Sequence, residues 1–314
     1  MRKNKTEARK MYDLVVIKRK LNMKKVIAVA IITVIVVVLA TILGMNVAQE
    51  EYNRKYAKEV EEQIAKKEEE DRIKKEEEQA RIQAEIQNRI NKTSNPLTEQ
   101  QQDSILHIYR DTGEKRVFLT FDDGPTKAVT PFILDILKQE NVKATFFLLG
   151  TNAQYNAELI KREFNEGHYI ANHGYSHRYK DIYASPEATL EEYNKTEQII
   201  RDALENQNYR SNLFRFPGGS NGGFYNDAKQ ASKEYLKENG IVHLDWNALT
   251  EDSAGTYTKE QLLQNAIDTI GEKQSVVILM HDSSDKILTY EMLPDLIHYL
   301  KEKGYNFKNI YDII

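Results

Sequence analysis

The side chains best suited to chemistry in this sequence are two adjacent carboxylates, Asp122 and Asp123, and two imidazoles four residues apart, His173 and His177. Two histidines and one carboxylate can hold a divalent metal such as Zn²⁺ and leave one coordination position open for water. The second aspartate could then act as a base on that water. The histidine pair is a weak signal alone, but two carboxylates at the end of a buried strand are costly to leave unpaired.

The other candidate residues lie far along the chain, so the fold must bring them to this pair of carboxylates. Short apolar stretches alternate with helix-length segments, which predicts a parallel sheet covered on both faces. We expect strands at 116–121, 144–149, 169–172, 213–216, 241–245, 275–280 and 305–310, and helices at 131–140, 157–165, 186–206, 227–238, 259–270 and 290–303.

The polar residues all follow predicted strands, which in parallel α/β folds places them at one rim. Arg215 lies by the end of the fourth strand, Asp252 follows the fifth and His281 directly follows the sixth. Seven strand–helix units closing on themselves would form an irregular (β/α) barrel of TIM type, and an open doubly wound sheet is the alternative.

Four segments also resemble the signatures of a known family. Residues 120–125 (TFDDGP) resemble the first signature of the NodB-homology polysaccharide deacetylases, carbohydrate esterase family 4, and His173-x-x-x-His177 resembles the second. Residues 215–219 (RFPGG) resemble the third signature and 279–281 (LMH) the fifth. The matches follow the family's order, and the resemblance implies a distorted (β/α) barrel and a metal-dependent deacetylase.

The resemblance assigns a role to each residue of the reaction centre. Asp122 would be the general base, and Arg215 would hold it in place and ionised. His281 would protonate the departing amine, with its pKa raised by Asp252. The metal ligands would be Asp123, His173 and His177.

The resemblance also implies residues that contact the substrate. The backbone N–H of Gly218 would face the developing oxyanion, and Leu279 would help form the pocket for the acetyl methyl group. Trp246, with Asp252, partly meets the fourth signature. The chain departs from the family at Gly218 and Ser253, where an aromatic residue is usual, and these changes affect substrate specificity more than chemistry. Candidates to replace the lost surface are Asn221, Phe224 and Tyr225.

The N-terminal part predicts a membrane location. Residues 26–45 are an uncharged apolar run of 20 residues, which as a helix would span roughly the 30 Å of a bilayer's hydrocarbon core. Residues 1–25 are rich in Lys and Arg and should form a cytoplasmic tail, which leaves the rest of the chain extracytoplasmic. We therefore expect a single-pass anchor in the cell membrane, in contact with lipid. A cleaved signal peptide is the alternative, disfavoured by the length of the run.

Residues 50–103 are expected to form a charged helical spacer and linker. The segment is dense in helix-forming Glu, Lys, Arg and Gln, with many Glu–Lys pairs three or four residues apart. Its apolar stripe is broken, which favours a solvated helix over a coiled coil. The globular domain then occupies residues 104–314.

The composition of the chain limits which partners and which metal ligands are possible. The net charge of −4 argues against a nucleic-acid partner. The chain has no cysteine, so a metal must be held by histidines and carboxylates. Zn²⁺ suits such ligands best, and Co²⁺, Ni²⁺ or Fe²⁺ are alternatives.

An outward-facing deacetylase on a stalk would meet the cell wall, so the expected substrate is the N-acetylglucosamine of peptidoglycan. N-acetylmuramic acid, an exopolysaccharide or chitin oligosaccharides would require the same chemistry. A catalytically silent glycan-binding module on a membrane stalk is the alternative from another class of protein.

Overall fold

The computed structural model describes residues 25–27, 29, 31–32, 47–255 and 257–314, which fall into two units divided after Arg81. Of the predicted membrane span at 26–45, residues 26, 27, 29, 31 and 32 are described, and they are helical. The rest of that prediction, and residues 1–24 of the predicted tail, lie outside the described residues. Within the described part of the chain, no helix has both the length and the apolar character needed to cross a bilayer.

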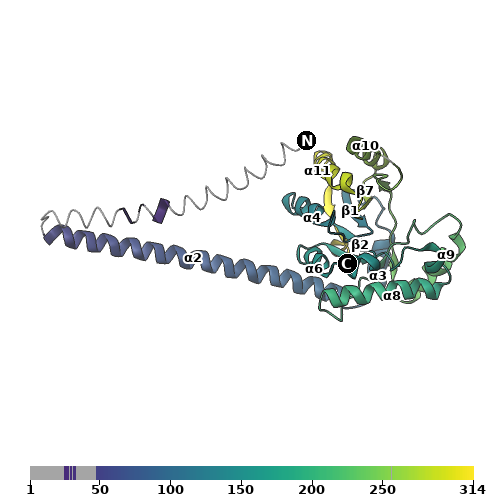
Figure 1. The fold of residues 1–314 in the computed structure, drawn as a ribbon, viewed down its shortest axis with the longest axis horizontal. Coiled ribbons are helices and arrows are strands. Elements are labelled where there is room, and N and C mark those ends of the chain that lie inside the picture. The colour runs from purple at the N-terminus through teal and green to yellow at the C-terminus, as the bar shows by residue number, and fades with distance from the viewer. Residues whose placement is uncertain (1–24, 28, 30, 33–46, 256) are drawn as a thin grey trace. The chain divides into compact units, whose positions relative to one another are not determined.

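The charged segment forms one helix, α2 (Val47–Thr93), drawn in purple and blue in Figure 1. From residue 54 to residue 81 every side chain is exposed except Val60, which is half-buried. Ion pairs one turn apart support the helix, with Arg72 bonded to Glu69 at 2.7 Å. The helix is therefore as expected, while its action as a spacer and any coiled-coil pairing stay predictions.

The last turns of α2 belong to the second unit, which begins at residue 82. Ile86 and Ile90 pack against the core of that unit, and the next helix, α3 (Glu99–Leu106), buries Ile105 completely. The compact unit thus begins before the predicted boundary at residue 104. Ile86 and Ile90, which belong to the broken apolar stripe of the sequence, are the residues that pack these last turns against the domain core.

The eight strands of the described chain form one parallel sheet in the order β5-β4-β3-β2-β1-β7-β6, with β8 beside the first half of β1. Strand β1 is buried after its first residue, as its continuous apolar run predicts. Its register with β7 sets Asp122 opposite His281, so two predicted site residues lie side by side. The strands are β1 (Arg116–Asp122), β2 (Thr145–Leu148), β3 (Tyr169–Asn172), β4 (Leu213–Phe214), β5 (Val242–His243), β6 (Ala248–Leu249), β7 (Ser275–His281) and β8 (Asn306–Lys308).

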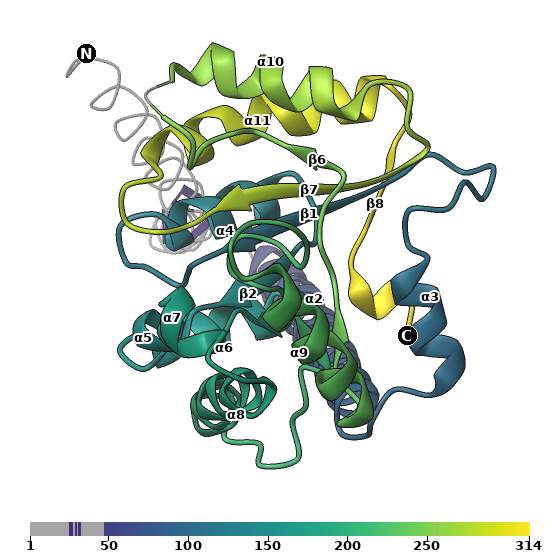
Figure 2. The ribbon, with the colours of Figure 1, turned by 90° about the vertical axis from the view of Figure 1, so that its right-hand side faces the viewer.

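Helices cover the sheet, and Figure 2 shows α10 and α11 on one side of β1 and β7, with α6 and α8 on the other. Each connection from a strand to the next helix leaves the same edge of the parallel sheet, where polar side chains can gather. The helices are α4 (Thr130–Gln139), α5 (Gly150–Ala153), α6 (Ala157–Asn165), α7 (Tyr179–Ile182), α8 (Pro186–Ala203), α9 (Asn226–Glu238), α10 (Lys259–Ile270) and α11 (Ile287–Glu302), followed by a 3₁₀ turn at Ile310–Asp312.

The predicted α/β fold with a parallel sheet is confirmed, but a closed barrel of TIM type is not formed. Among the described residues no ladder joins β5 to β6, so the sheet is a curled half-barrel open at that side. Strands β4, β5 and β6 are only two residues long. The predicted strands at 213–216 and 241–245 were too long because buried apolar residues such as Phe216 and Leu244 continue into loops without pairing.

Candidate active site

Three side chains with metal-binding atoms converge at the carboxyl ends of β1 and β3. Asp123 directly follows β1, and His173 directly follows β3, with His177 four residues later. The Oδ1 atom of Asp123 lies 3.6 Å from Nε2 of His173 and 3.6 Å from Nε2 of His177. The three ligand atoms all lie within 4.8 Å of one another. Asp123 and His177 take the left-handed conformation, with φ of 74° and 59°, a strain typical of functional sites.

The donor atoms of these residues fit a divalent metal. Asp123 Oδ1 is buried and has no hydrogen-bond partner in the described chain, a costly state for a carboxylate oxygen. Nδ1 of His173 lies 2.8 Å from the carbonyl oxygen of Arg215. Because that oxygen only accepts, Nδ1 must carry the proton, which leaves a lone pair on Nε2 for a metal. Burial lowers the pKa of His173 to about 3, so the ring is neutral at physiological pH.

Arg215 organises the neighbouring carboxylate. Its side chain is fully buried, and its guanidinium carbon lies 3.9 Å from the centroid of the Phe147 ring, a cation–π contact. Nη1 donates to Asp122 Oδ1 at 2.8 Å and to the hydroxyl of Thr120 at 2.7 Å. The remaining donors reach the carbonyl oxygens of Leu244 and Asp245. A buried guanidinium satisfied in this way can serve as a fixed partner for Asp122.

Asp122 lies within reach of both the candidate ligands and the arginine. Only 2% of its surface is exposed, and its Oδ2 lies 3.8 Å from Nε2 of His173. Burial raises its pKa, and the opposing charge of Arg215 does not cancel that effect. Arg215 therefore has the expected place, but it does not hold Asp122 below the ordinary carboxyl pKa. A carboxylate with a raised pKa is a stronger base, which suits proton removal from water.

His281 and Asp252 form the other titrating pair. Nδ1 of His281 lies 2.7 Å from Asp252 Oδ1, and the backbone N–H of His281 donates to Oδ2 at 2.8 Å. Burial alone would lower the pKa of His281, but the hydrogen bond and charge of Asp252 outweigh it and raise the pKa to about 9. The imidazole is thus a cation at neutral pH, with Nε2 as its second donor.

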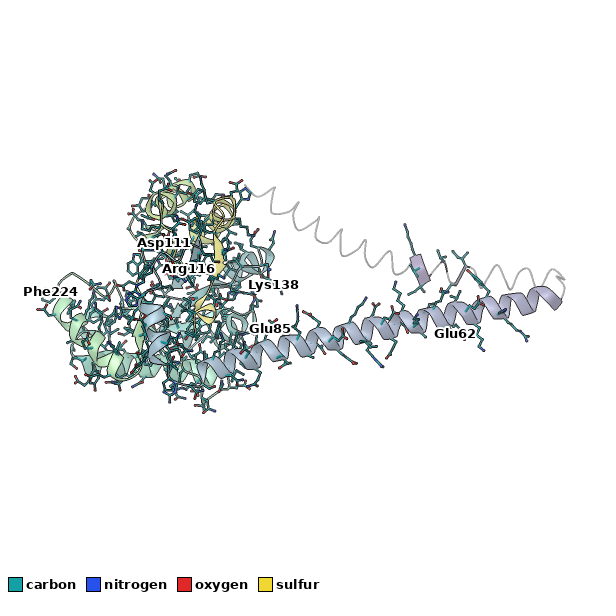
Figure 3. The ribbon with its side chains drawn as sticks, turned by 180° about the vertical axis from the view of Figure 1, so that it is seen from behind. Glu62, Glu85, Asp111, Arg116, Lys138 and Phe224 are labelled. Atoms are coloured by element: carbon teal, nitrogen blue, oxygen red, sulfur yellow. The ribbon has the colours of Figure 1, made fainter. Side chains whose placement is uncertain are left out.

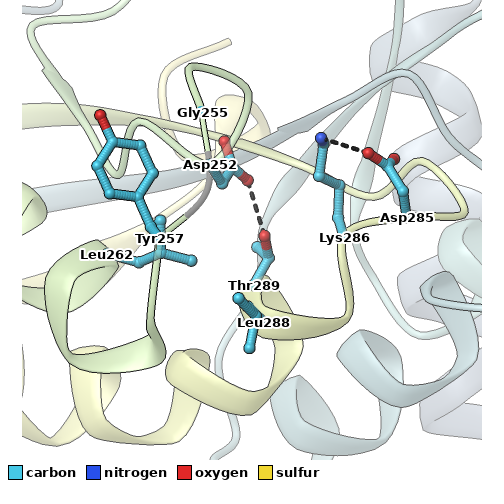
Figure 4. A pocket seen from close by; sticks show the side chains of 8 residues that line it. All are labelled: Asp252, Gly255, Tyr257, Leu262, Asp285, Lys286, Leu288 and Thr289. Atoms are coloured by element: carbon cyan, nitrogen blue, oxygen red, sulfur yellow. Dashed lines mark hydrogen bonds and ion pairs between the residues drawn. The ribbon is translucent and has the colours of Figure 1, made fainter.

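Thr289 on α11 completes the environment of Asp252. Its hydroxyl donates to Asp252 Oδ2 at 2.8 Å, a contact drawn in Figure 4. Asp252 and Thr289 line a pocket of about 170 Å³, together with Lys286 and Tyr257. No sequence signal distinguishes Thr289 from other threonines, because only the fold brings α11 against the loop that carries Asp252.

The three predicted substrate contacts lie around this centre. Gly218 has φ of 71°, and a Cβ there would lie 2.4 Å from the hydroxyl oxygen of Tyr179. Trp246 is half-buried, with Arg215 5.7 Å from its ring centroid, while Leu279 is buried in β7 two residues before His281. The oxyanion role of Gly218 and the methyl-pocket role of Leu279 stay predictions. Tyr179 was missed, and it fills the space that a side chain at residue 218 would need.

Asp282 is a second residue that sequence reasoning missed. It is fully buried, its N–H donates to the carbonyl oxygen of Asp122 at 3.0 Å, and its carboxylate accepts from Thr130 at 2.5 Å. A Cβ added to Gly124 would lie 2.0 Å from Asp282 Oδ2, so only glycine fits there. Asp282 thus packs against the turn that carries Asp123. Its place directly after His281 is the one signal in the sequence.

A buried carboxylate beside an arginine, a histidine–aspartate pair and three side chains able to bind a metal lie on one rim of a parallel half-barrel, an arrangement that suits a hydrolase. Residues 109–241 match the family model for polysaccharide deacetylases. The solved structure of a CE4 esterase from Streptococcus mutans is similar, with a TM-score of 0.60 and 31% sequence identity, covering 70% of this chain and 94% of that one. The chain belongs to the polysaccharide deacetylase family, that of carbohydrate esterase family 4.

Two curated relatives indicate the range of substrates in the family. The peptidoglycan-N-acetylglucosamine deacetylase PgdA of Listeria monocytogenes is 32% identical over 231 residues, which are 72% of this chain but 44% of the relative. The peptidoglycan-N-acetylmuramic acid deacetylase PdaA of Bacillus subtilis is 29% identical over 214 residues, 65% of this chain and 73% of the relative. The chain thus spans less than half the length of PgdA.

Proposed function

We propose that this protein hydrolyses the N-acetyl group of N-acetylglucosamine in peptidoglycan. The reaction requires a divalent metal, and Zn²⁺ is the metal we propose. The observation that carries the proposal is the convergence of Asp123 Oδ1, a buried atom without a hydrogen-bond partner, with the Nε2 atoms of His173 and His177. A metal bound there would lower the pKa of a water molecule and polarise the acetyl carbonyl group.

The protein's own groups supply the proton transfers. Asp122, fixed by Arg215, takes a proton from the attacking water. The backbone N–H of Gly218 faces the negative charge that develops on the carbonyl oxygen. His281, held protonated by Asp252, donates a proton to the nitrogen of the sugar as the carbon–nitrogen bond breaks. The products are acetate and a free amine on the glycan.

The choice of sugar rests on similarity and on the expected location. PgdA, whose name specifies N-acetylglucosamine, matches more of this chain and at higher identity than PdaA, whose name specifies N-acetylmuramic acid. Purified peptidoglycan is treated with the full-length protein and digested with a muramidase, and the free amines are then located on the sugars. We expect amines on glucosamine; amines only on muramic acid would overturn this choice.

We also propose that the chain is anchored in the cell membrane by residues 26–45, with the basic tail in the cytoplasm. Because the chain has no cysteine, single cysteines can report its topology without background. Lys10→Cys and Lys58→Cys are compared by labelling of intact cells with a membrane-impermeant maleimide. We expect labelling of Lys58→Cys only, and labelling of both positions, or release of the protein into the medium, would contradict the anchor.

A further inference from the structure

The loop between β4 and α9 ends in an exposed aromatic side chain. Phe224 has 96% of its surface exposed, and Figure 3 shows it at the outer edge of the domain. A single exposed phenylalanine is common on protein surfaces and does not indicate a binding site. Several exposed apolar side chains next to a site do indicate one.

Most of the exposed apolar side chains of this domain occur on the rim that carries the candidate active site. Residues 82–314 contain nine exposed large apolar side chains among those described, and three of them, Ile82, Leu106 and Tyr109, lie elsewhere. The other six lie at or just before the beginning of a helix, which in a parallel α/β fold is the rim at the carboxyl ends of the strands. They are Phe132, Tyr155, Tyr179, Phe224, Ile287 and Leu288.

A continuous row of rings joins the candidate metal ligands to Phe224. The ring of Tyr179 lies 5.7 Å from that of His177 and 6.2 Å from that of Tyr225, measured between centroids. Tyr225 in turn lies 5.0 Å from Phe224, edge to face. Each tyrosine joins an apolar face to a hydroxyl group, a combination suited to a ligand that has both kinds of surface.

The loop that carries Phe224 is fixed at its base. Ser220 donates from its N–H and its hydroxyl to the two carboxylate oxygens of Asp245, at 3.0 and 2.6 Å. The N–H of Gly222 donates to Asn226 Oδ1 at 2.8 Å. Gly222 and Gly223 have φ of 75° and 74°, a conformation that other residues rarely adopt. The base of the loop is thus held in place, which lowers the entropic cost of presenting the ring to a ligand.

We propose that Tyr179, Tyr225 and Phe224 form a sugar-binding subsite, in which Phe224 stacks on a pyranose ring next to the sugar that loses its acetyl group. A pyranose has an apolar face of C–H groups and a rim of hydroxyl groups, which matches a phenylalanine face beside tyrosine hydroxyls. Because the row of rings starts at His177, its occupant must be continuous with the substrate, and so a glycan chain fits better than a protein partner. This inference rests on the proposed function and extends it by assigning the residues that bind the neighbouring sugar.

The test compares one substrate chemistry at two lengths, with Phe224→Ala, Phe224→Leu and Phe224→Tyr in the full-length protein. Acetate release is measured on intact glycan strands of peptidoglycan and on the monosaccharide N-acetylglucosamine, which has no neighbouring sugar. We expect Phe224→Ala to raise KM on the strands by about tenfold, the effect of one aromatic contact, with kcat unchanged. On the monosaccharide the variant should equal the wild type. Because the side chain is exposed, its removal should leave the thermal unfolding temperature unchanged.

The other two variants separate stacking from simple apolar contact. Phe224→Tyr keeps the aromatic face and should match the wild type, whereas Phe224→Leu keeps apolar bulk and should behave like Phe224→Ala. An unchanged KM on strands in Phe224→Ala, an equal loss on both substrates, or full activity in Phe224→Leu would overturn the subsite.

A binding measurement keeps the two proposals separate. The chelator-treated protein is sedimented with insoluble peptidoglycan, so that turnover plays no part. Wild-type acetate release with no effect of Phe224→Ala on either measurement would refute the subsite and leave the proposed function intact. Binding that Phe224→Ala weakens, without acetate release by any variant, would refute the proposed function and support the subsite.

Discussion

Replacing Asp252 with asparagine should shift the alkaline side of the enzyme's pH–rate profile to lower pH. In the proposed reaction His281 must be protonated to donate to the departing amine, so activity is lost as the pH rises through its pKa. In the wild type that pKa is raised to about 9, with Asp252 as the main cause against the opposing effect of burial. The asparagine would keep the shape of the side chain while removing its charge and its preference to accept from Nδ1 of His281.

The size of the effect follows from the contacts. Without Asp252, burial opposes only the weaker attraction of Asp122 and Asp123, so the pKa of His281 should return toward its ordinary value of about 6.5. A decrease of about 2.5 pH units corresponds to about 3 kcal/mol. At pH 7.5 the protonated fraction of His281 would fall from about 97% to about 10%, so kcat should fall about tenfold, and the loss should shrink as the pH is lowered.

The assay is acetate release from peptidoglycan between pH 5.5 and about 9.5, fitted for kcat and for kcat/KM. Asp285→Asn is the matched control, because Asp285 borders the same pocket (Figure 4) but pairs with Lys286 at 2.7 Å. The control should keep the wild-type profile. If Asp252→Asn lowers kcat by the same factor at every pH and its alkaline limb stays near 9, the reasoning is refuted, and Asp252 has another role.

Two further substitutions test the buried contacts of the site. Arg215→Met leaves Asp122 buried without its partner and should lower the free energy of unfolding in urea by about 3–5 kcal/mol at neutral pH. Arg178→Met, which removes an exposed ion pair, should cost no more than about 1 kcal/mol, and equal losses in the two variants would contradict the assignment. Gly218→Ala should lower kcat, because its Cβ would lie 2.4 Å from the Tyr179 hydroxyl oxygen. Tyr179→Phe should restore part of that loss in the double variant, and no recovery would place the cause in the backbone conformation instead.

The sequence predicted the half of the site that lies at clear strand ends. Strand β1 is a continuous apolar run that stops at two carboxylates, so Asp122 and Asp123 were placed at the rim by pattern alone. The same holds for His281 after β7. The strands in between are short, and their ends are poorly marked. Arg215, one residue after the two-residue strand β4, was also placed at the rim by this pattern, while its role beside Asp122 came from the resemblance to a family signature.

Contacts between residues that are far apart in the sequence could not be predicted from local sequence patterns. Thr289 and Tyr179 are ordinary residues of helical segments, and their roles depend on which loop the helix meets. The opening of the barrel between β5 and β6 depends on two short strands that fail to pair. Ile86 and Ile90 were read as part of a solvated helix, because only the presence of the domain beside them makes them core residues.

The measurement that tests the central claim most directly is acetate release from peptidoglycan as metal is returned to the chelator-treated protein. We predict no release from the metal-free protein, recovery with about one equivalent of Zn²⁺ per chain, and no recovery in His173→Ala. His298→Ala should recover fully, because that histidine is exposed on α11 and pairs with Glu302. Undiminished release by protein shown to hold no metal, or full recovery in His173→Ala, would contradict the account.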